Sequence, residues 1–273
     1  MMDAQRLQKL ILSLMHDPSF RSRLQNKPSP FLQRRGCTLE EIEHVLSFDP
    51  RLYEADSLRS DRILTGLLDI FPVSVWSALQ SETFRQLRGF FRTDSFHTVL
   101  WDGGYVFERF SSYLVTEIGA DASFVALENA IESVRSTKVP ADECSEPTHY
   151  VLHPKVRLVT LEAGVFDAYL AAQGTIQRST LTGAEFLLEI DDGPLTVPTT
   201  QADEYILVES ADEPQIGPIS GSLASTLLFL ESSRRHDQLT QKLIDEGAAE
   251  HECDELISHF QEHGWIKGQV FTP

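Results

Sequence analysis

Cysteine is scarce in this chain, and long apolar runs are absent. The three cysteines, Cys37, Cys144 and Cys253, lie far apart and form no Cys-x-x-Cys pair. Their number and spacing argue against a disulfide framework and a cysteine-rich zinc site, so we expect reduced thiols. No run approaches the roughly 20 apolar residues of a membrane span, and the amino-terminal residues lack the continuous apolar core of a signal peptide. The sequence predicts a cytoplasmic protein with no membrane partner.

Basic residues are also few. Lys and Arg total 23 against 41 Asp and Glu, which gives a net charge of −18 at pH 7. Because nucleic-acid binding depends on neutralisation of phosphates by Lys and Arg, this balance argues against a nucleic-acid partner. Residues 1–140 hold 16 basic and 18 acidic side chains, whereas residues 141–273 hold 7 and 23. The difference predicts two units with different surfaces, the second either simply well solvated or suited to a basic partner.

The common motifs of active sites are missing. There is no Gly-x-Ser-x-Gly elbow, P-loop or dinucleotide-binding glycine motif. Near the carboxyl end, four potential metal ligands cluster: His251, Cys253, His259 and His263. On a helix each residue advances about 100°, so Cys253 falls in the apolar stripe and only His259 and His263 share a face. Two histidines are too few for a typical zinc site. We interpret this segment as a core-packing helix with a polar rim; an enzyme with a metal at these histidines is the alternative.

The first half has the pattern of a helical array. Thr38 and Glu41 have the spacing of a capping box, and two Asp-Pro pairs, at 17–18 and 49–50, place an N-cap residue before a proline. Amphipathic helices are expected at residues 57–70, 75–91, 105–117 and 122–136. The sequence therefore predicts an all-helical domain over residues 1–140.

The pattern changes in the second half. Residues 136–149 are rich in Pro, Ser, Thr and acids and predict a linker. Strands are expected at residues 156–162, 184–190 and 204–210, and helices at 223–232, 236–247 and 251–268. Short strands followed by three helices are a winged-helix-like order of elements. The predicted fold class is α+β, with a carboxy-terminal winged-helix-like peptide recognition domain over residues 150–273.

Without a self-contained active site, a binding protein is the more natural expectation than an enzyme. A strand beside a helix can accept an extended peptide as an added strand, with main-chain hydrogen bonds for affinity and side-chain pockets for specificity. We expect a peptide to add to the strand at 204–210, against the closing helix. The candidate peptide-binding residues are Tyr205, Leu207, Glu209, Leu256, His259, Phe260 and His263.

Several segments carry a family resemblance. Residues 125–136, VALENAIESVRS, are similar to the "LArLExA…R" helix of the partner proteins of methanobactin biosynthesis. The matching positions are Leu127, Glu128, Ala130 and Arg135. Residues 15–72 resemble the helical start of the same proteins, and residues 153–172 resemble their transition into strands. The long strand region and the three-helix end favour the branch of this family that acts in the 3-thiaglutamate pathway.

The resemblance implies a non-catalytic subunit in natural-product (RiPP) biosynthesis. Such a subunit binds a ribosomally made precursor peptide through a recognition element and forms a heterodimer with a barrel-fold oxidase. That partner carries a multinuclear non-haem iron site and excises the β-carbon of a peptide cysteine. Because the family's iron ligands lie on the partner, the resemblance implies no cofactor on this chain. The alternative is a DNA-associated or regulatory winged-helix protein.

Overall fold

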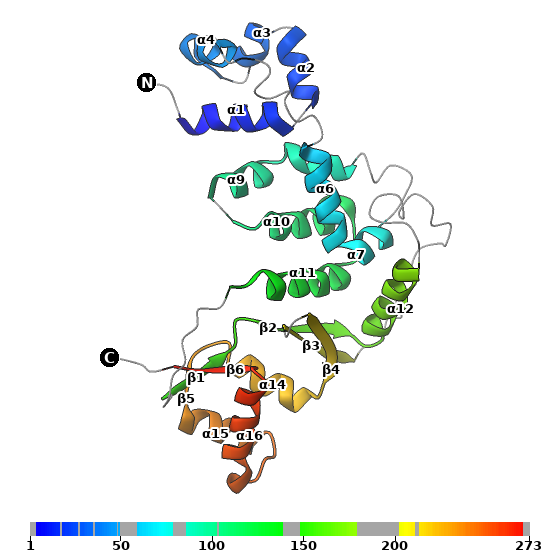
Figure 1. Cartoon of the computed structure of the whole chain (residues 1–273), viewed down its shortest axis with the longest axis vertical. Coiled ribbons are helices and arrows are strands. Elements are labelled where there is room, and N and C mark those ends of the chain that lie inside the picture. Colours follow the sequence, from blue (N-terminus) through cyan, green and yellow to red (C-terminus); the bar gives the residue numbers. More distant parts are fainter. Residues whose placement is uncertain are drawn as a thin grey trace. The chain divides into compact units, whose positions relative to one another are not determined.

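The chain divides into two compact units. The computed structural model describes residues 4–16, 18–26, 28–34, 36–47, 49, 59–78, 86–102, 104–138, 148–178, 202–210 and 213–269. One unit comprises Met1–Asp121 with Ile176–Pro194, and the other comprises Ala122–Thr175 with Leu195–Pro273. Figure 1 labels the α-helices and strands of both units.

The described part of the first unit is mainly helical, and its second segment begins with the last residues of α12 (Val165–Arg178). Its elements are α1 (Ala4–His16), α2 (Pro18–Asn26), α3 (Pro28–Gln33), α4 (Leu39–Ser47), α6 (Arg59–Ile70), α7 (Pro72–Ser77), η1 (Arg88–Arg92), α9 (Asp94–Asp102), α10 (Val106–Tyr113) and η2 (Leu114–Ile118). The predicted capping box opens α4. The Thr38 N–H donates to Glu41 Oε2 at 2.8 Å, and the Glu41 N–H donates to Thr38 Oγ1 at 3.2 Å. The helix expected at residues 75–91 is wrong in extent, because α7 ends at Ser77 and residues 88–92 form a 3₁₀ turn.

Phenylalanine dominates the core beneath η1. Phe90 is fully buried and contacts Phe96 and Phe110, with ring centroids 5.3 and 5.1 Å away. Thr93 closes the 3₁₀ turn and opens α9, because its hydroxyl donates to the Phe90 carbonyl and accepts from the Phe96 N–H. This short link brings consecutive aromatic side chains into one packed cluster.

The second unit is mixed. Its elements are α11 (Ala122–Ser136), β1 (His149–Leu152), β2 (Val156–Glu162), most of α12 (Val165–Arg178), β3 (Asp203–Ser210), β4 (Pro214–Ile219), α14 (Gly221–Phe229), β5 (Arg234–Arg235), α15 (His236–Asp245), η3 (Glu250–Glu252), α16 (Cys253–Glu262) and β6 (Ile266–Gln269). Among the described residues the strands form two three-stranded antiparallel sheets, ordered β5-β1-β6 and β2-β3-β4. The α+β class is confirmed, and so are the strands predicted at 156–162 and 204–210. The strand expected at 184–190 and most of the expected linker lie outside the described residues.

The β2-β3-β4 sheet has a helix on each side. Alternate residues of β3 point to opposite faces: Leu207 joins the core of the carboxy-terminal helices, whereas Ile206 and Val208 face the other way and are fully buried. Figure 1 shows α11 and α14 on opposite sides of this sheet. The boundary expected near residue 140 places α11 with the first domain, whereas its packing on β2 and β3 groups it with the second unit.

The three carboxy-terminal helices share a core with the small β5-β1-β6 sheet. The buried members of this core are Tyr150, Val156, Leu207, Leu227, Leu230, Leu239, Leu243, Cys253, Ile257, Phe260 and Ile266. The chain order here is helix, short strand, two helices and a strand, with β1 as the central strand. Within the described ranges, no helix has both the length and the apolar character needed to cross a bilayer.

Candidate functional site

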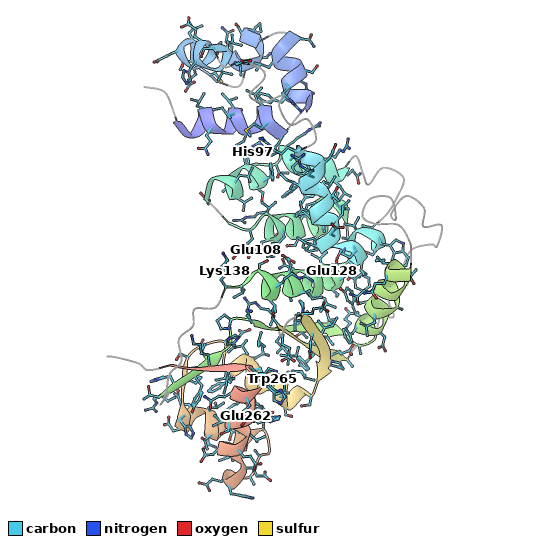
Figure 2. All side chains as sticks on the ribbon, viewed as in Figure 1. His97, Glu108, Glu128, Lys138, Glu262 and Trp265 are labelled. Carbon is cyan, nitrogen blue, oxygen red and sulfur yellow. The ribbon has the colours of Figure 1, made fainter. Side chains whose placement is uncertain are left out.

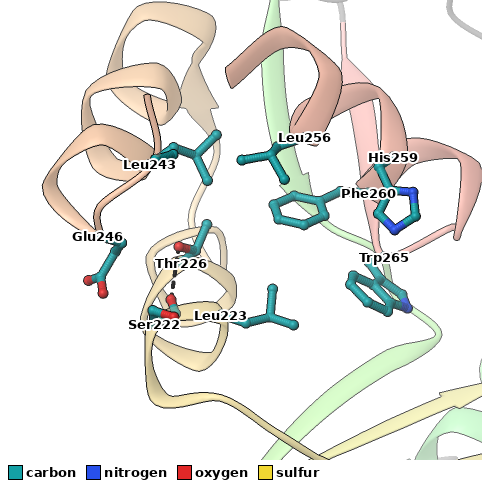
Figure 3. A pocket seen from close by; sticks show the side chains of 10 residues that line it. Ser222, Leu223, Thr226, Leu243, Glu246, Leu256, His259, Phe260 and Trp265 are labelled. Carbon is teal, nitrogen blue, oxygen red and sulfur yellow. Dashed lines mark hydrogen bonds between the residues drawn. The ribbon is translucent and has the colours of Figure 1, made fainter. Parts of the chain in front are cut away.

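An open apolar pocket lies among α14, α15 and α16. Its cavity volume is about 320 Å³, which falls at the lower end of the range for small-ligand sites, roughly 300–1,000 Å³. Its lining residues are Ser222, Leu223, Thr226, Leu243, Glu246, Ala248, Leu256, His259, Phe260 and Trp265. Figure 3 shows Leu243 and Leu256 pointing toward one another, with Glu246 at one end and His259 and Trp265 at the other. The walls are apolar and the ends are polar.

Two of the helices that line this pocket, α15 and α16, are each terminated by a glycine, and the residue after each glycine lines the pocket. At the end of α16, Gly264 has a φ of 67°, the Gly264 N–H donates to the Gln261 carbonyl, and the Trp265 N–H donates to the Phe260 carbonyl. This is a Schellman motif, which typically brings the second residue past the helix against an apolar residue of the last turn. Accordingly, the Trp265 ring packs on Phe260, with centroids 5.8 Å apart.

The end of α15 repeats the arrangement. Gly247 has a φ of 103°, and the Ala248 N–H donates to the Leu243 carbonyl at 3.0 Å. Ala248 and Leu243 both line the pocket. Left-handed backbone at both glycines therefore turns the chain so that the next residue completes a wall, a geometry that glycine adopts without steric cost.

Trp265 is fixed from several sides. Its indole N–H donates to the Glu209 carboxylate on β3, and its ring stacks on His263 with centroids 5.1 Å apart. The His263 ring in turn packs edge-on against the His259 ring, with centroids 4.3 Å apart. Figure 2 shows Trp265 and Glu262 at the carboxyl end of α16. A partly exposed tryptophan held in one orientation is a preorganised contact surface.

A charged pair spans the opposite end. Lys242 Nζ lies 2.6 Å from Glu246 Oε1 and 2.7 Å from Ser225 Oγ, which links α15 to α14. The hydrogen bonds with Lys242 and at Ser225 lower the pKa of the Glu246 carboxyl from its ordinary value of 4.5. Glu246 is therefore ionised at neutral pH and neutralises Lys242.

The predicted residues of α16 largely meet at this site. Leu256, His259 and Phe260 line the pocket, and His263 contacts it through Trp265. Cys253 lies instead in the core with 1% of its surface exposed. Burial raises the pKa of its thiol, which stays protonated at neutral pH.

The predicted residues of β3 share one face, but they do not form a strand-binding edge. Leu207 is buried in the core, Tyr205 lies near Gly221 at the start of α14, and Glu209 holds Trp265. β3 is the central strand of its sheet, with β2 paired to one edge and β4 to the other. The expectation that a peptide adds as a strand to β3 is therefore wrong, because neither edge is free to pair.

The outer edge of β4 is also unsuited to strand addition. The Ser210 N–H donates to the Lys155 carbonyl. The backbone N–H and C=O groups of even-numbered residues in β3 therefore point toward β2, and those of odd-numbered residues point toward β4. In the antiparallel register of β3 and β4, the backbone hydrogen-bonding groups of Pro214, Ile216 and Pro218 therefore point away from β3, toward the outer edge. Prolines at two of these positions remove donors, a common protection of sheet edges.

The sequence prediction missed seven of the ten residues that line the pocket. Leu223 and Thr226 come from α14, and Leu243 and Glu246 come from α15. Trp265 had a detectable signal, since a glycine directly after an amphipathic helix typically precedes an apolar contact with the last turn. The contributions of α14 and α15 depend on tertiary packing and have no local signature.

The histidines of this region do not gather into a metal site. His259 and His263 are adjacent, while His251 is exposed and Cys253 faces the core. Across the part of the chain that the structure describes, no three His, Cys, Asp or Glu side chains come together as a possible metal-binding group. The chemistry that this arrangement supports is the burial of apolar groups between polar ends.

In comparisons with known proteins, no family model matches the sequence, and no curated protein shows significant similarity to it.

Proposed function

We propose that this protein is a non-catalytic subunit that binds a ribosomally made precursor peptide and presents a cysteine of that peptide to a partner iron oxidase. The observation that carries the proposal is the pocket among α14, α15 and α16, where Leu223, Leu256 and Trp265 remain partly exposed around an apolar cavity. Apolar side chains held open to solvent in this way are typical of a binding surface.

The pocket combines apolar walls with polar ends, which suits a peptide that has both apolar and polar groups. Apolar walls bury side chains, while the ends provide Glu246 and His259 for polar contacts. Helix-lined grooves commonly take the apolar face of a peptide. The site needs no change in the β2-β3-β4 sheet, where both edges of β3 are already paired.

The nature of the partner rests on the sequence resemblance to the partner proteins of methanobactin biosynthesis. In that arrangement the multinuclear non-haem iron site belongs to a barrel-fold oxidase, and the oxidation is the 3-thiaglutamate type of β-carbon excision. This chain would contribute binding and positioning, which raise the effective concentration of the peptide at the oxidase.

A DNA-associated or regulatory role is the competing proposal, because helices arranged with a small sheet also occur in DNA-binding proteins. The helices around the pocket oppose it. From residue 221 to 265 the sequence holds 9 acidic and 3 basic side chains, whereas binding to DNA requires net positive charge at the contact surface. A gel-shift titration with duplex DNA at low salt separates the two, since binding that salt abolishes would support the DNA role.

The test of the proposal uses two leucines of α14. Leu223 lines the pocket, whereas Leu228 is 43% exposed and does not. A labelled candidate precursor peptide, sought among short reading frames beside the gene and a barrel-oxidase gene, is titrated against the whole protein. We expect Leu223→Asp to weaken peptide binding by about tenfold or more, as for a buried contact residue, and Leu228→Asp to leave it unchanged.

Co-expression with the oxidase should give a stable complex by size-exclusion chromatography with light scattering. Absence of any peptide binding by the unmodified protein would contradict the proposed function. Equal losses in the two leucine variants, with both variants folded by circular dichroism, would show that the peptide binds elsewhere.

A further inference from the structure

The volume of the pocket limits the size of the group that can bind in it. A cavity of about 320 Å³ is roughly twice an apolar cavity of about 150 Å³ that accommodates benzene. It therefore has room for two large apolar side chains rather than one. Because Glu246 and Trp265 lie at opposite ends of the lining (Figure 3), the two side chains would lie one after the other between them.

The walls favour a helical occupant. All three sides of the pocket come from helices and the turns that end them. On a helix, residues three or four positions apart lie next to each other on one face, which provides two neighbouring side chains without any strand pairing. Strand pairing is unavailable at β3 and lacks donors at two positions of β4.

The surroundings of the pocket are acidic. On α16, Glu255 is four residues before His259 and Glu262 is three residues after it, so both flank the same side of the helix. Both side chains are exposed. Across the pocket the Lys242 ammonium is neutralised by Glu246. A bound segment with basic side chains beside its apolar face would be attracted to this rim.

We infer that the pocket takes an amphipathic helical segment of the peptide, with two large apolar side chains three or four positions apart and Lys or Arg beside them. This inference rests on the proposed function and specifies the segment that the site recognises. A second copy of this chain is a poorer occupant of the rim, because its own carboxy-terminal half is acidic, with 7 basic and 23 acidic side chains over residues 141–273.

The test is an unbiased selection. A random peptide library displayed on its own mRNA is selected for binding to the full chain, and the selected peptides are then titrated against the Leu223→Asp variant. We expect enrichment of sequences with the apolar pair and with Lys or Arg nearby. Replacement of both apolar residues of a selected peptide by Ala should weaken binding by about tenfold or more.

A separate pair of double variants tests how much the rim carboxylates contribute to peptide affinity. Glu255→Gln with Glu262→Gln removes two rim carboxylates without touching the lining, and we expect about threefold weaker binding and a smaller loss of affinity with added salt. Asp237→Asn with Glu231→Gln, which lie outside the lining and off α16, should leave binding unchanged.

The outcomes separate the two proposals. Selected peptides that bind Leu223→Asp equally well, or that lack the apolar pair or the basic residues, would overturn the inference while peptide binding itself stands. A selection that yields no binder at all would contradict both.

Discussion

The aromatic cluster of the first unit and the pocket of the second unit differ in how they place large apolar side chains. In the first, Phe90, Phe96 and Phe110 have no exposed surface, and the Phe90 ring contacts both of the others. In the second, Leu256 and Trp265 stay partly exposed around a cavity, although Phe260 beside them is buried. Burial of apolar surface stabilises a fold by about 25 cal/mol per Å², so the pocket forgoes stability that the aromatic cluster provides. This contrast supports the proposed binding role of the pocket.

Charge follows the same division. The first unit holds 20 acidic and 15 basic side chains, whereas the second holds 21 acidic and 8 basic ones. Uniform negative charge adds self-repulsion to a folded unit. The partly exposed apolar residues of the pocket thus lie in the unit with the larger excess of negative charge, and the proposed basic amphipathic peptide would complement both features.

The largest effect should come from the aromatic core of the first unit. Phe90→Ala removes a fully buried ring and leaves a cavity, which costs about 3–5 kcal/mol of unfolding free energy. Hydrogen exchange followed by mass spectrometry reports amide protection for each unit separately. We expect lost protection in the first unit with peptide affinity of the folded protein unchanged, whereas Phe260→Ala should reduce both protection of the second unit and affinity. Loss of peptide affinity in folded Phe90→Ala would contradict the division of roles.

Local sequence patterns were sufficient for much of the fold. The capping box of Thr38 and Glu41 and the bounds of β2 depend on residues a few positions apart, so periodicity and caps reveal them. β4 was missed because the segment PQIGPI contains two prolines and a glycine, which are unfavourable in a strand, and only its position at the sheet edge tolerates them. With β4 missing from the prediction, β3 appeared to offer a free edge.

The site was predictable only where one helix face supplies it. Leu256, His259 and Phe260 recur at helical spacing, so their common side follows from the sequence. Leu223, Leu243 and Trp265 come from different elements and meet through tertiary packing, which no local pattern encodes. The pocket is therefore a property of three helices, whereas the sequence indicated one of its walls.

An intermediate effect should distinguish two glycines, one in each unit. Gly264 has a φ of 67° and turns the chain from α16 into Trp265, so Gly264→Ala forces an L-residue into left-handed backbone at a cost of about 1–3 kcal/mol. Gly66 lies exposed within α6 with open space around it, and Gly66→Ala should stabilise by about 0.5–1 kcal/mol. Urea denaturation followed by circular dichroism measures both. Destabilisation by Gly66→Ala, or none by Gly264→Ala, would contradict the assigned conformations.

The smallest effect concerns the charged end of the pocket. The pKa of Glu246 is lowered in the folded state, chiefly by its hydrogen bond with Lys242. Its contribution to stability is therefore complete above the unfolded pKa and is lost as the pH falls through the folded pKa. Glu246→Gln keeps the size and the acceptor oxygen but removes the charge, so the unfolding free energy of the unmodified protein should exceed that of the variant at neutral pH and approach it in acid.

Denaturation curves between about pH 3 and pH 7 measure this difference, a range that covers the titration of carboxyl groups. Lys242→Met provides the matched partner, because the coupling between the two substitutions should be present at neutral pH and vanish once Glu246 is protonated. A difference that grows on acidification would mean that Glu246 is stabilised in its protonated form. That outcome would also remove the neutralisation of Lys242, and with it the contrast between this end of the pocket and the opposite side, which the exposed carboxylates of Glu255 and Glu262 flank.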